Sequence, residues 1–362
     1  MTDLPTMEAL SREAAAVRER VPAEEALRGR HIALYGTGFL GRWAVDHLRG
    51  AGVEPTICFD GNPSKQGGTF HDIPVAAFPD TSGALPDAVL ITARHAVQSI
   101  APMLDRHGLS ACSFDGWYVG HRFPQFAALH DALFTDEQSC QTLRAVLHAM
   151  LTGDLHPLSA VFERDQYFCL PHLLSPGEDY YVDAGAFVGD SVERFIWATG
   201  GAFKKIWAFE PVDRPFQALT ARTERLSSEW ALNKGQITPV RAGLGAVNGQ
   251  STAVTDGGHM QSAALTPIAE GAVPILALDD YLDGQPVTFF KADVEGMEME
   301  LLAGASRTIS RCRPKLAICV YHYPCDLPDI VARIRSYVPD YKFALRHHSS
   351  QQMETVLYGW IE

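Results

Sequence analysis

Residues 180–191 read YYVDAGAFVGDS, an apolar strand that runs into a turn with two glycines and then into a helix. A second apolar stretch, residues 205–209, ends on Glu210. That acid lies about 20 residues past the turn, the interval at which a βαβ unit places a carboxylate against a ribose. The glycine spacing differs from the G-x-G-x-x-G of dinucleotide-binding proteins and favours S-adenosylmethionine over NAD. The structural alternative is an ordinary glycine-containing βα turn.

In an open parallel sheet, ligands bind at the carboxyl ends of the strands. We expect Gly185 and Gly189 to allow close approach of the methionine part of the cofactor, because glycine has no Cβ atom. Glu210 is expected to accept hydrogen bonds from the ribose hydroxyls, while Asp183 either lies near the ligand or orients the turn. The complete expected cofactor set is Asp183, Gly185, Ala186, Gly189, Asp190, Ser191, Glu210 and Pro211.

The composition is that of a globular protein with about two domains. The chain has 362 residues, of which 46% are hydrophobic and 20% are charged, and it is longer than one ordinary domain. Its net charge of −13 argues against nucleic acid as the main partner, because phosphate binding needs clustered Lys and Arg. No apolar run reaches the roughly 18 residues of a membrane span, and the charged N-terminus is unlike a secretory signal. Seven scattered cysteines without a C-x-x-C pair favour a reducing cytoplasm.

A second glycine motif lies near the N-terminus. The apolar residues 31–35 lead into GTGFLG at residues 36–41, and another apolar stretch, residues 56–59, ends on Asp60. This order predicts a nucleotide site at Gly36, Gly38, Gly41 and Asp60. Residues 60–75 resemble the second-strand region of small sugar-nucleotide-binding Rossmann domains, which points to a nucleotide-sugar more than to NAD. The alternative is a structural or docking module that binds no nucleotide.

The pattern of elements predicts an α/β protein in three parts. Residues 1–122 are expected to form N-terminal helices and a small parallel α/β domain, and residues 123–175 a helical bridge. Residues 176–362 alternate strands and helices and end in an antiparallel pair, the layout of a class I methyltransferase sheet. The polar segment 255–262 is expected to be either a lid over the cofactor or an inert surface loop.

Six ordered motifs resemble the FkbM-type methyltransferases. They are FERDQYF (162–168), VDAGAFVGDS (182–191), AFEP (208–211), LDDY (278–281), FKADVEGME (290–298) and PKLAICVYH (314–322). The resemblance covers residues from about 160 to 360. It implies an S-adenosylmethionine-dependent O-methyltransferase of natural products and sugars, without identifying the acceptor.

The chemistry requires a group that accepts the proton of the acceptor hydroxyl. Asp293 and His322 follow two neighbouring predicted strands, and a free histidine has the better pKa near neutrality. The alternative for His322 is a structural, hydrogen-bonded histidine. A divalent metal at Asp293, Glu295 and His322, with Glu298 as a further candidate ligand, is a less favoured possibility.

The leading interpretation is a cytoplasmic O-methyltransferase that acts on a small molecule, a sugar that is free or nucleotide-linked. One alternative is an NAD-dependent sugar-nucleotide oxidoreductase or epimerase, although the first domain lacks a Y-x-x-x-K pair. The other is a non-catalytic nucleotide-binding scaffold. No nucleic-acid or membrane partner is expected, and a homo-oligomer stays open.

Overall fold

The computed structural model describes residues 4–79, 84–134, 136–255, 263–267 and 273–362. By its contacts the chain divides into two units, which are described separately. Unit 1 contains residues 1–162, 323–325 and 349–354, and unit 2 contains residues 163–322, 326–348 and 355–362. The predicted boundaries at residues 122 and 175 stay a prediction. Most of the predicted lid, residues 256–262, lies outside the described residues.

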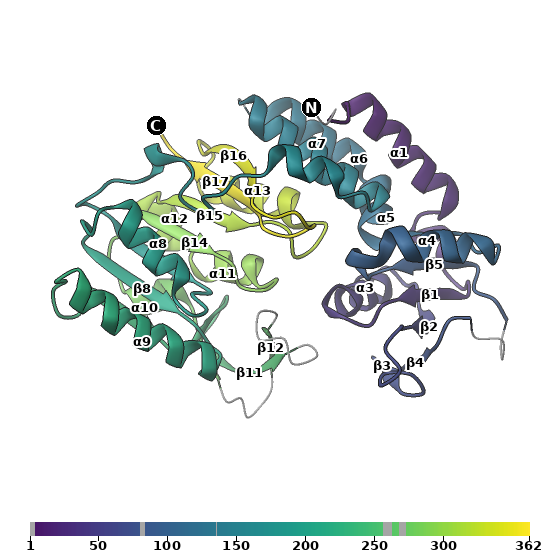
Figure 1. The fold of residues 1–362 in the computed structure, drawn as a ribbon, viewed down its shortest axis with the longest axis horizontal. Helices are drawn as coiled ribbons and strands as arrows, with labels where there is room; N and C mark the ends of the chain where they lie inside the picture. Colours follow the sequence, from purple (N-terminus) through teal and green to yellow (C-terminus); the bar gives the residue numbers. More distant parts are fainter. Residues whose placement is uncertain (1–3, 80–83, 135, 256–262, 268–272) are drawn as a thin grey trace. The chain divides into compact units, whose positions relative to one another are not determined.

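Unit 1 is built on a six-stranded sheet in the order β3-β4-β2-β1-β5-β6 (Figure 1). All neighbouring strands run parallel except β3 and β4, which confirms the predicted parallel α/β architecture. The strands are β1 (Ile32–Tyr35), β2 (Pro55–Phe59), β3 (Thr69–Phe70), β4 (Ile73–Ala76), β5 (Ala88–Ile91) and β6 (Ala111–Ser113). The helices are α1 (Met7–Arg20), α2 (Glu24–Leu27), α3 (Phe39–Gly50), α4 (Val97–Arg106), α5 (Phe114–His121), α6 (Phe123–Ala132) and α7 (Glu137–Thr152), with 3₁₀ turns η1 (Arg94–Ala96) and η2 (His156–Val161).

The strands of unit 1 are short and almost wholly apolar because helices cover the sheet. Ala33, Val89 and Ile91 are fully buried and pack against Leu104 of α4. Ser113 ends β6 and begins α5, where its hydroxyl accepts a hydrogen bond from Gly116 N at 2.9 Å. This N-cap explains why the chain turns directly from strand to helix at this point.

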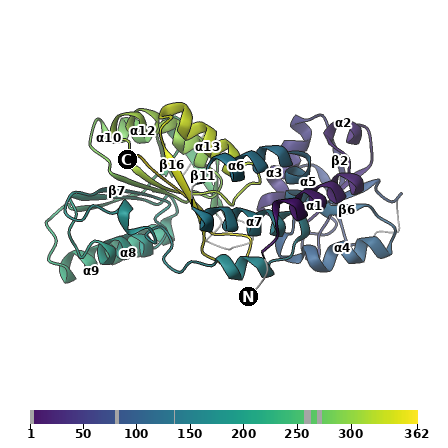
Figure 2. The same cartoon turned by 90° about the horizontal axis from the view of Figure 1, so that it is seen from above.

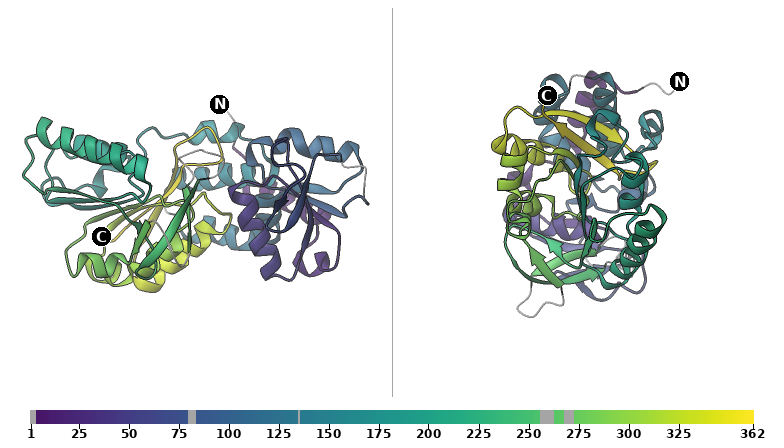
Figure 3. Two further views of the ribbon diagram at one scale, coloured as in Figure 1. Left: turned by 90° about the horizontal axis from the view of Figure 1, so that it is seen from below. Right: turned by 90° about the vertical axis from the view of Figure 1, so that its left-hand side faces the viewer.

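Unit 2 is built on a seven-stranded sheet in the order β16-β17-β15-β14-β7-β8-β9. Strands β15, β14, β7, β8 and β9 are parallel, and β17 is antiparallel to both β15 and β16, as the sequence predicted. Figure 2 shows α8 and α9 on one side of this sheet and α10, α12 and α13 on the other. Figure 3 shows the sheet from two further directions.

The bounds of these elements follow the predicted stretches closely. The strands are β7 (Tyr180–Ala184), β8 (Lys205–Phe209), β9 (Ile237–Val240), β14 (Phe289–Ala292), β15 (Lys315–Cys319), β16 (Lys342–His347) and β17 (Thr355–Trp360). The helices are α8 (Asp190–Ala198), α9 (Asp213–Glu229), α10 (Leu278–Leu282), α11 (Glu298–Gly304), α12 (Ser306–Cys312) and α13 (Asp326–Tyr337), with a 3₁₀ turn η3 (Pro171–Leu173). Tyr181, Phe195 and Phe289 are fully buried in the core between the sheet and the α8 side.

A small four-stranded sheet in unit 2 was not predicted. Its order is β10-β13-β11-β12, from β10 (Gly243–Leu244), β11 (Gly249–Thr255), β12 (Ala263–Pro267) and β13 (Val273–Leu276). This stretch is rich in Gly, Ser, Thr and Ala and shows no clear apolar alternation, which is why it reads as loop. Within the described part of the chain, no helix is both long and apolar enough to cross a membrane.

Candidate functional site

Polar residues gather at the carboxyl ends of four adjacent strands in unit 2. Asp183 lies in β7, Glu210 follows β8, Asp293 follows β14 and His322 lies shortly after β15. These strands are neighbours in the order β15-β14-β7-β8. All four residues were expected from the sequence, and the sheet brings their strand ends to one edge.

The glycine turn between β7 and α8 is fixed by backbone conformation. Gly185 and Gly189 have φ values of +74° and +83°, a region that other residues rarely adopt. A Cβ atom on Gly185 would lie 1.8 Å from the carbonyl oxygen of Asp293, and one on Gly189 would lie 2.8 Å from Leu219. Both glycines are therefore required by packing within the protein, a reason that differs from the ligand clearance we expected.

Glu210 is buried behind this turn, with 5% of its surface exposed. Its two carboxylate oxygens accept hydrogen bonds from the backbone N–H groups of Phe187, at 3.0 Å, and Val212, at 2.8 Å. Burial raises the pKa of Glu210 to about 7 and outweighs these two hydrogen bonds, which lower it. Each carboxylate oxygen has a second lone pair, so the group retains the capacity to accept hydroxyl hydrogen bonds.

Asp183 forms a buried network with Lys291, a residue outside the expected cofactor set. Its Oδ1 lies 3.1 Å from Lys291 Nζ, and its Oδ2 accepts a hydrogen bond from Ser191 Oγ at 2.5 Å. Lys291 also donates to the carbonyl oxygen of Gly185 at 2.6 Å. Burial opposes the charge of Lys291, but Asp183 and Asp293 outweigh burial and raise its pKa. Asp183 and Ser191 thus hold the turn in place through Lys291.

Asp293 is a partly exposed acid of the site, with a fifth of its side chain open to solvent. Strands β14 and β7 pair so that Ala292 is opposite Ala184, which places Asp293 beside Gly185. Tyr167 donates a hydrogen bond to Oδ2 at 2.8 Å, and Tyr321 donates one to Oδ1 at 3.1 Å. Burial favours the neutral acid, but Lys291 and His322 outweigh it and keep the pKa of Asp293 below its usual value.

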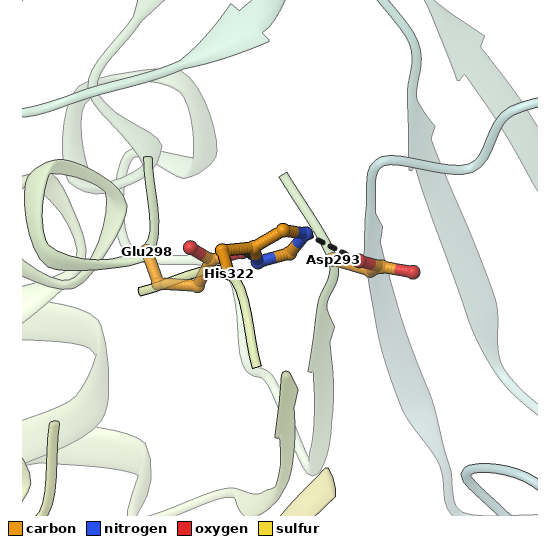
Figure 4. A group of neighbouring side chains, drawn as sticks. All are labelled: Asp293, Glu298 and His322. Carbon is orange, nitrogen blue, oxygen red and sulfur yellow. Dashed lines mark ion pairs between the residues drawn. The ribbon is translucent and has the colours of Figure 1, made fainter. Parts of the chain in front are cut away.

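His322 lies between the carboxylates of Asp293 and Glu298 (Figure 4), and Glu295 is a third acidic neighbour. Its Nδ1 is 3.1 Å from Glu298, and its Nε2 is 3.6 Å from both Asp293 and Glu295. Burial favours the neutral ring, but these acids outweigh burial and raise the pKa of His322 to about 10. The near-neutral pKa assumed from the sequence is therefore wrong, because the neighbouring acids come from a different strand end and from α11.

Among the described residues, one set of side chains has metal-ligand spacing: Asp293, Glu298 and His322, with one ligand atom from each within 4.8 Å of the others. Figure 4 shows these three side chains. Glu298, the further candidate ligand, takes the place that the expected set gave to Glu295. It lies on the first turn of α11, and the sequence left open whether it would converge with the strand end.

The other expected cofactor residues lie around the turn. Ala186 is fully buried and its N–H donates to Phe209 O at 2.9 Å. Asp190 is exposed at the start of α8, and Pro211 is half-buried directly after Glu210. Their expected contacts with a cofactor stay predictions.

The glycine motif of unit 1 forms a turn between β1 and α3. Gly36 has φ +113°, and a Cβ on Gly41 would lie 2.7 Å from Gly36 O; Gly38 is the N-cap of α3. Asp60 accepts hydrogen bonds from the N–H and hydroxyl of Thr37 and lies 3.6 Å from Lys65. The four expected residues thus come together, and Asp60 already binds the glycine turn.

A hollow of about 520 Å³ lies elsewhere in unit 2. Its lining includes Lys204, Lys205 and Gln236, which surround the amino end of β8. This is the opposite edge of the sheet from Glu210 and Asp293, so we do not assign the hollow to the site.

The site also contains Glu298 and three residues that were not in the expected set. These three are Tyr167, Tyr321 and Lys291. Tyr167 lies in FERDQYF, Lys291 in FKADVEGME and Tyr321 in PKLAICVYH. The signal was therefore present in the motifs. Their partners were not apparent, because Tyr167 and Asp293 are 126 residues apart in the chain.

Comparisons with known proteins agree with this geometry. The methyltransferase FkbM domain family matches residues 183–345. The chain is similar to the solved structure of a methyltransferase FkbM from Methylobacillus flagellatus KT, with 25% identity, a TM-score of 0.60, and 98% of this chain and 100% of that chain covered. Weaker likeness relates it to a putative rRNA methylase from Clostridium thermocellum, with 10% identity, a TM-score of 0.35, and coverage of 53% and 91%. No curated protein matches the chain.

The match spans the glycine turn, Glu210, Asp293 and His322. The match favours a methyltransferase over the two alternatives, an NAD-dependent oxidoreductase and a non-catalytic scaffold. Residues 183–345 therefore match a methyltransferase FkbM domain, and the chain is a methyltransferase, an activity that implies S-adenosylmethionine as methyl donor.

Proposed function

We propose that the enzyme transfers a methyl group to a hydroxyl of a sugar or a related natural product. The observation that carries the proposal is Asp293, a partly exposed carboxylate beside the glycine turn, in a site where Asp183, Glu210 and Glu298 are more buried. A carboxylate at this position suits an acceptor that donates an O–H hydrogen bond. Seven free cysteines favour a reducing compartment such as the cytoplasm.

The residues around the turn fit the cofactor that the family implies. Glu210 has capacity for two ribose hydroxyls, and the turn from Gly185 to Gly189 is held in place by Lys291 and Asp183. S-adenosylmethionine, when bound, supplies a methyl group already activated by a positively charged sulfur. The remaining cofactor residues in the proposal are Ala186, Asp190, Ser191 and Pro211.

Asp293 is proposed to orient the acceptor hydroxyl and to take its proton as the new O–C bond forms. Tyr167 and Tyr321 hold its two oxygens, and His322 acts with it from 3.6 Å away. A positive charge on the His322 ring keeps Asp293 ionised, so that its oxygens accept hydrogen bonds rather than donate one.

The test is turnover with a panel of free and nucleotide-linked sugars, with the methylated product identified by mass spectrometry. Asp293→Asn is expected to lower turnover by about 100-fold while S-adenosylhomocysteine affinity, measured by calorimetry, stays unchanged. Asp340→Asn makes the same chemical change at an exposed position and serves as the control. Wild-type turnover in Asp293→Asn would remove that residue from the mechanism, and methylation confined to nitrogen acceptors would overturn the sugar hydroxyl.

Chelation separates this mechanism from the metal alternative. Because the proposed proton transfer uses side chains alone, turnover is expected to survive EDTA treatment. Loss of turnover that Mg²⁺ or Mn²⁺ restores would favour a cation at Asp293, Glu298 and His322.

For unit 1 we propose that the glycine motif binds the diphosphate of a nucleotide-linked acceptor. The N-terminus of α3 offers N–H groups and a positive dipole end. Calorimetry with UDP and GDP should detect binding that S-adenosylhomocysteine does not displace, and Gly38→Val should abolish it. Gly50→Val, at the last residue of α3, where a Cβ meets nothing within 4 Å, is the control. Absence of binding at millimolar nucleotide would leave a docking role for this unit.

A further inference from the structure

Tyr167 has an unusual backbone conformation for a buried tyrosine. It lies between η2 and η3, its φ is +70°, and 6% of its surface is exposed. A non-glycine residue in this region is strained, and such strain persists only where the surroundings enforce it.

The surroundings that hold Tyr167 are identifiable. Its backbone N–H donates to the hydroxyl of Tyr358 at 2.9 Å, and that hydroxyl also lies 3.0 Å from His348 Nε2. Tyr358 is fully buried in β17. The segment is therefore fastened to a buried residue of an interior strand of the sheet.

The side chain of Tyr167 extends from this anchor into the site. Its hydroxyl donates to Asp293 Oδ2 at 2.8 Å, and the amino group of Lys291 lies 5.0 Å from the centre of its ring. A cation over a ring face is attracted to it. One residue thus contacts both the acid that faces the acceptor and the lysine that supports the glycine turn.

We propose that Tyr167 is a positioning residue for methyl transfer, whose hydroxyl fixes the rotation of the Asp293 carboxylate toward the acceptor. The inference rests on the proposed role of Asp293. The hydrogen bond from Tyr321 to Oδ1 restrains the other oxygen, so loss of the Tyr167 hydroxyl leaves the carboxylate held from one side. An acid rotated away from the hydroxyl loses the alignment on which catalysis by positioning depends.

Tyr167→Phe tests this, because it keeps the ring against Lys291 and removes only the hydroxyl. We expect kcat to fall by roughly 10-fold or more, with the KM for S-adenosylmethionine unchanged. Tyr341→Phe is the matched control: it also deletes a buried tyrosine hydroxyl, which donates to the carbonyl oxygen of Pro314 at 2.6 Å, just before the amino end of β15. It should lose stability with kcat near that of the wild type.

A double-variant cycle separates positioning from a structural effect. If Tyr167 acts through Asp293, Tyr167→Phe costs nothing further in an Asp293→Asn background. Multiplied losses in the double variant, or equal kcat values in Tyr167→Phe and Tyr341→Phe, would overturn the inference. Full activity of Asp293→Asn by itself would instead overturn the proposed role of Asp293, so the two failures are distinguishable.

Discussion

Glu210 is a buried carboxyl group whose protonation differs between the folded and unfolded protein. Burial raises its pKa from 4.5 to about 7. Between these values the folded state keeps the proton and the unfolded state releases it, so stability falls as pH rises. We expect this contribution to be fully present below about pH 4.5 and lost by about pH 7, with a size of up to about 3 kcal/mol.

The measurement compares urea unfolding of the wild type and Glu210→Gln across pH 4.5 to 8. The glutamine cannot titrate, so the stability difference between the two proteins should shift in favour of the variant as pH rises. A constant difference over this range would contradict the raised pKa.

The position of Glu210 was predictable from sequence because the interval between the turn and the acid within a βαβ unit is local. Its pKa was not predictable, because burial depends on the whole sheet.

At the scale of elements, the β7–α8 turn depends on β14 as much as on its own sequence. Gly185→Ala would place a methyl group 1.8 Å from Asp293 O at φ +74°. A left-handed conformation alone costs a non-glycine residue roughly 1–2 kcal/mol. Because the clash here is with backbone, we expect a larger total loss of stability, of at least about 3 kcal/mol.

Gly177→Ala is the control, since Gly177 has φ +86° and no atom within 4 Å of an added Cβ. It carries the conformational cost alone, and chemical unfolding of both variants measures the difference. Similar losses of stability in the two variants would show that β14 can shift away.

The sequence predicted the turn and both of its flanking elements, because strand, glycines and helix are consecutive. It could not reveal why Gly185 is required, since Asp293 O belongs to a distant strand.

At the scale of the whole molecule, chain order and contact units do not coincide. Residues 323–325 belong to unit 1, although the residues on both sides belong to unit 2. Within unit 1, Tyr323 stacks against Phe39, with ring centres 5.2 Å apart, and against Trp43, at 5.1 Å. The predicted division at residues 122 and 175 follows the chain and could not include such an excursion, because nothing in the local pattern marks Tyr323 as part of an N-terminal core.

Tyr323→Ala should therefore weaken unit 1 and leave unit 2 intact. Loss of two aromatic stacks is worth about 1–3 kcal/mol, which should accelerate amide hydrogen exchange in α3, the helix that carries Phe39 and Trp43. Exchange in β7 and β14 is the internal control and should be unchanged, because these strands belong to unit 2 and different regions of a protein can open separately. If exchange became faster in β7 and β14 and stayed at the wild-type rate in α3, Tyr323 would belong to unit 2. Unchanged exchange in α3 would show that its two ring contacts contribute no stability to unit 1.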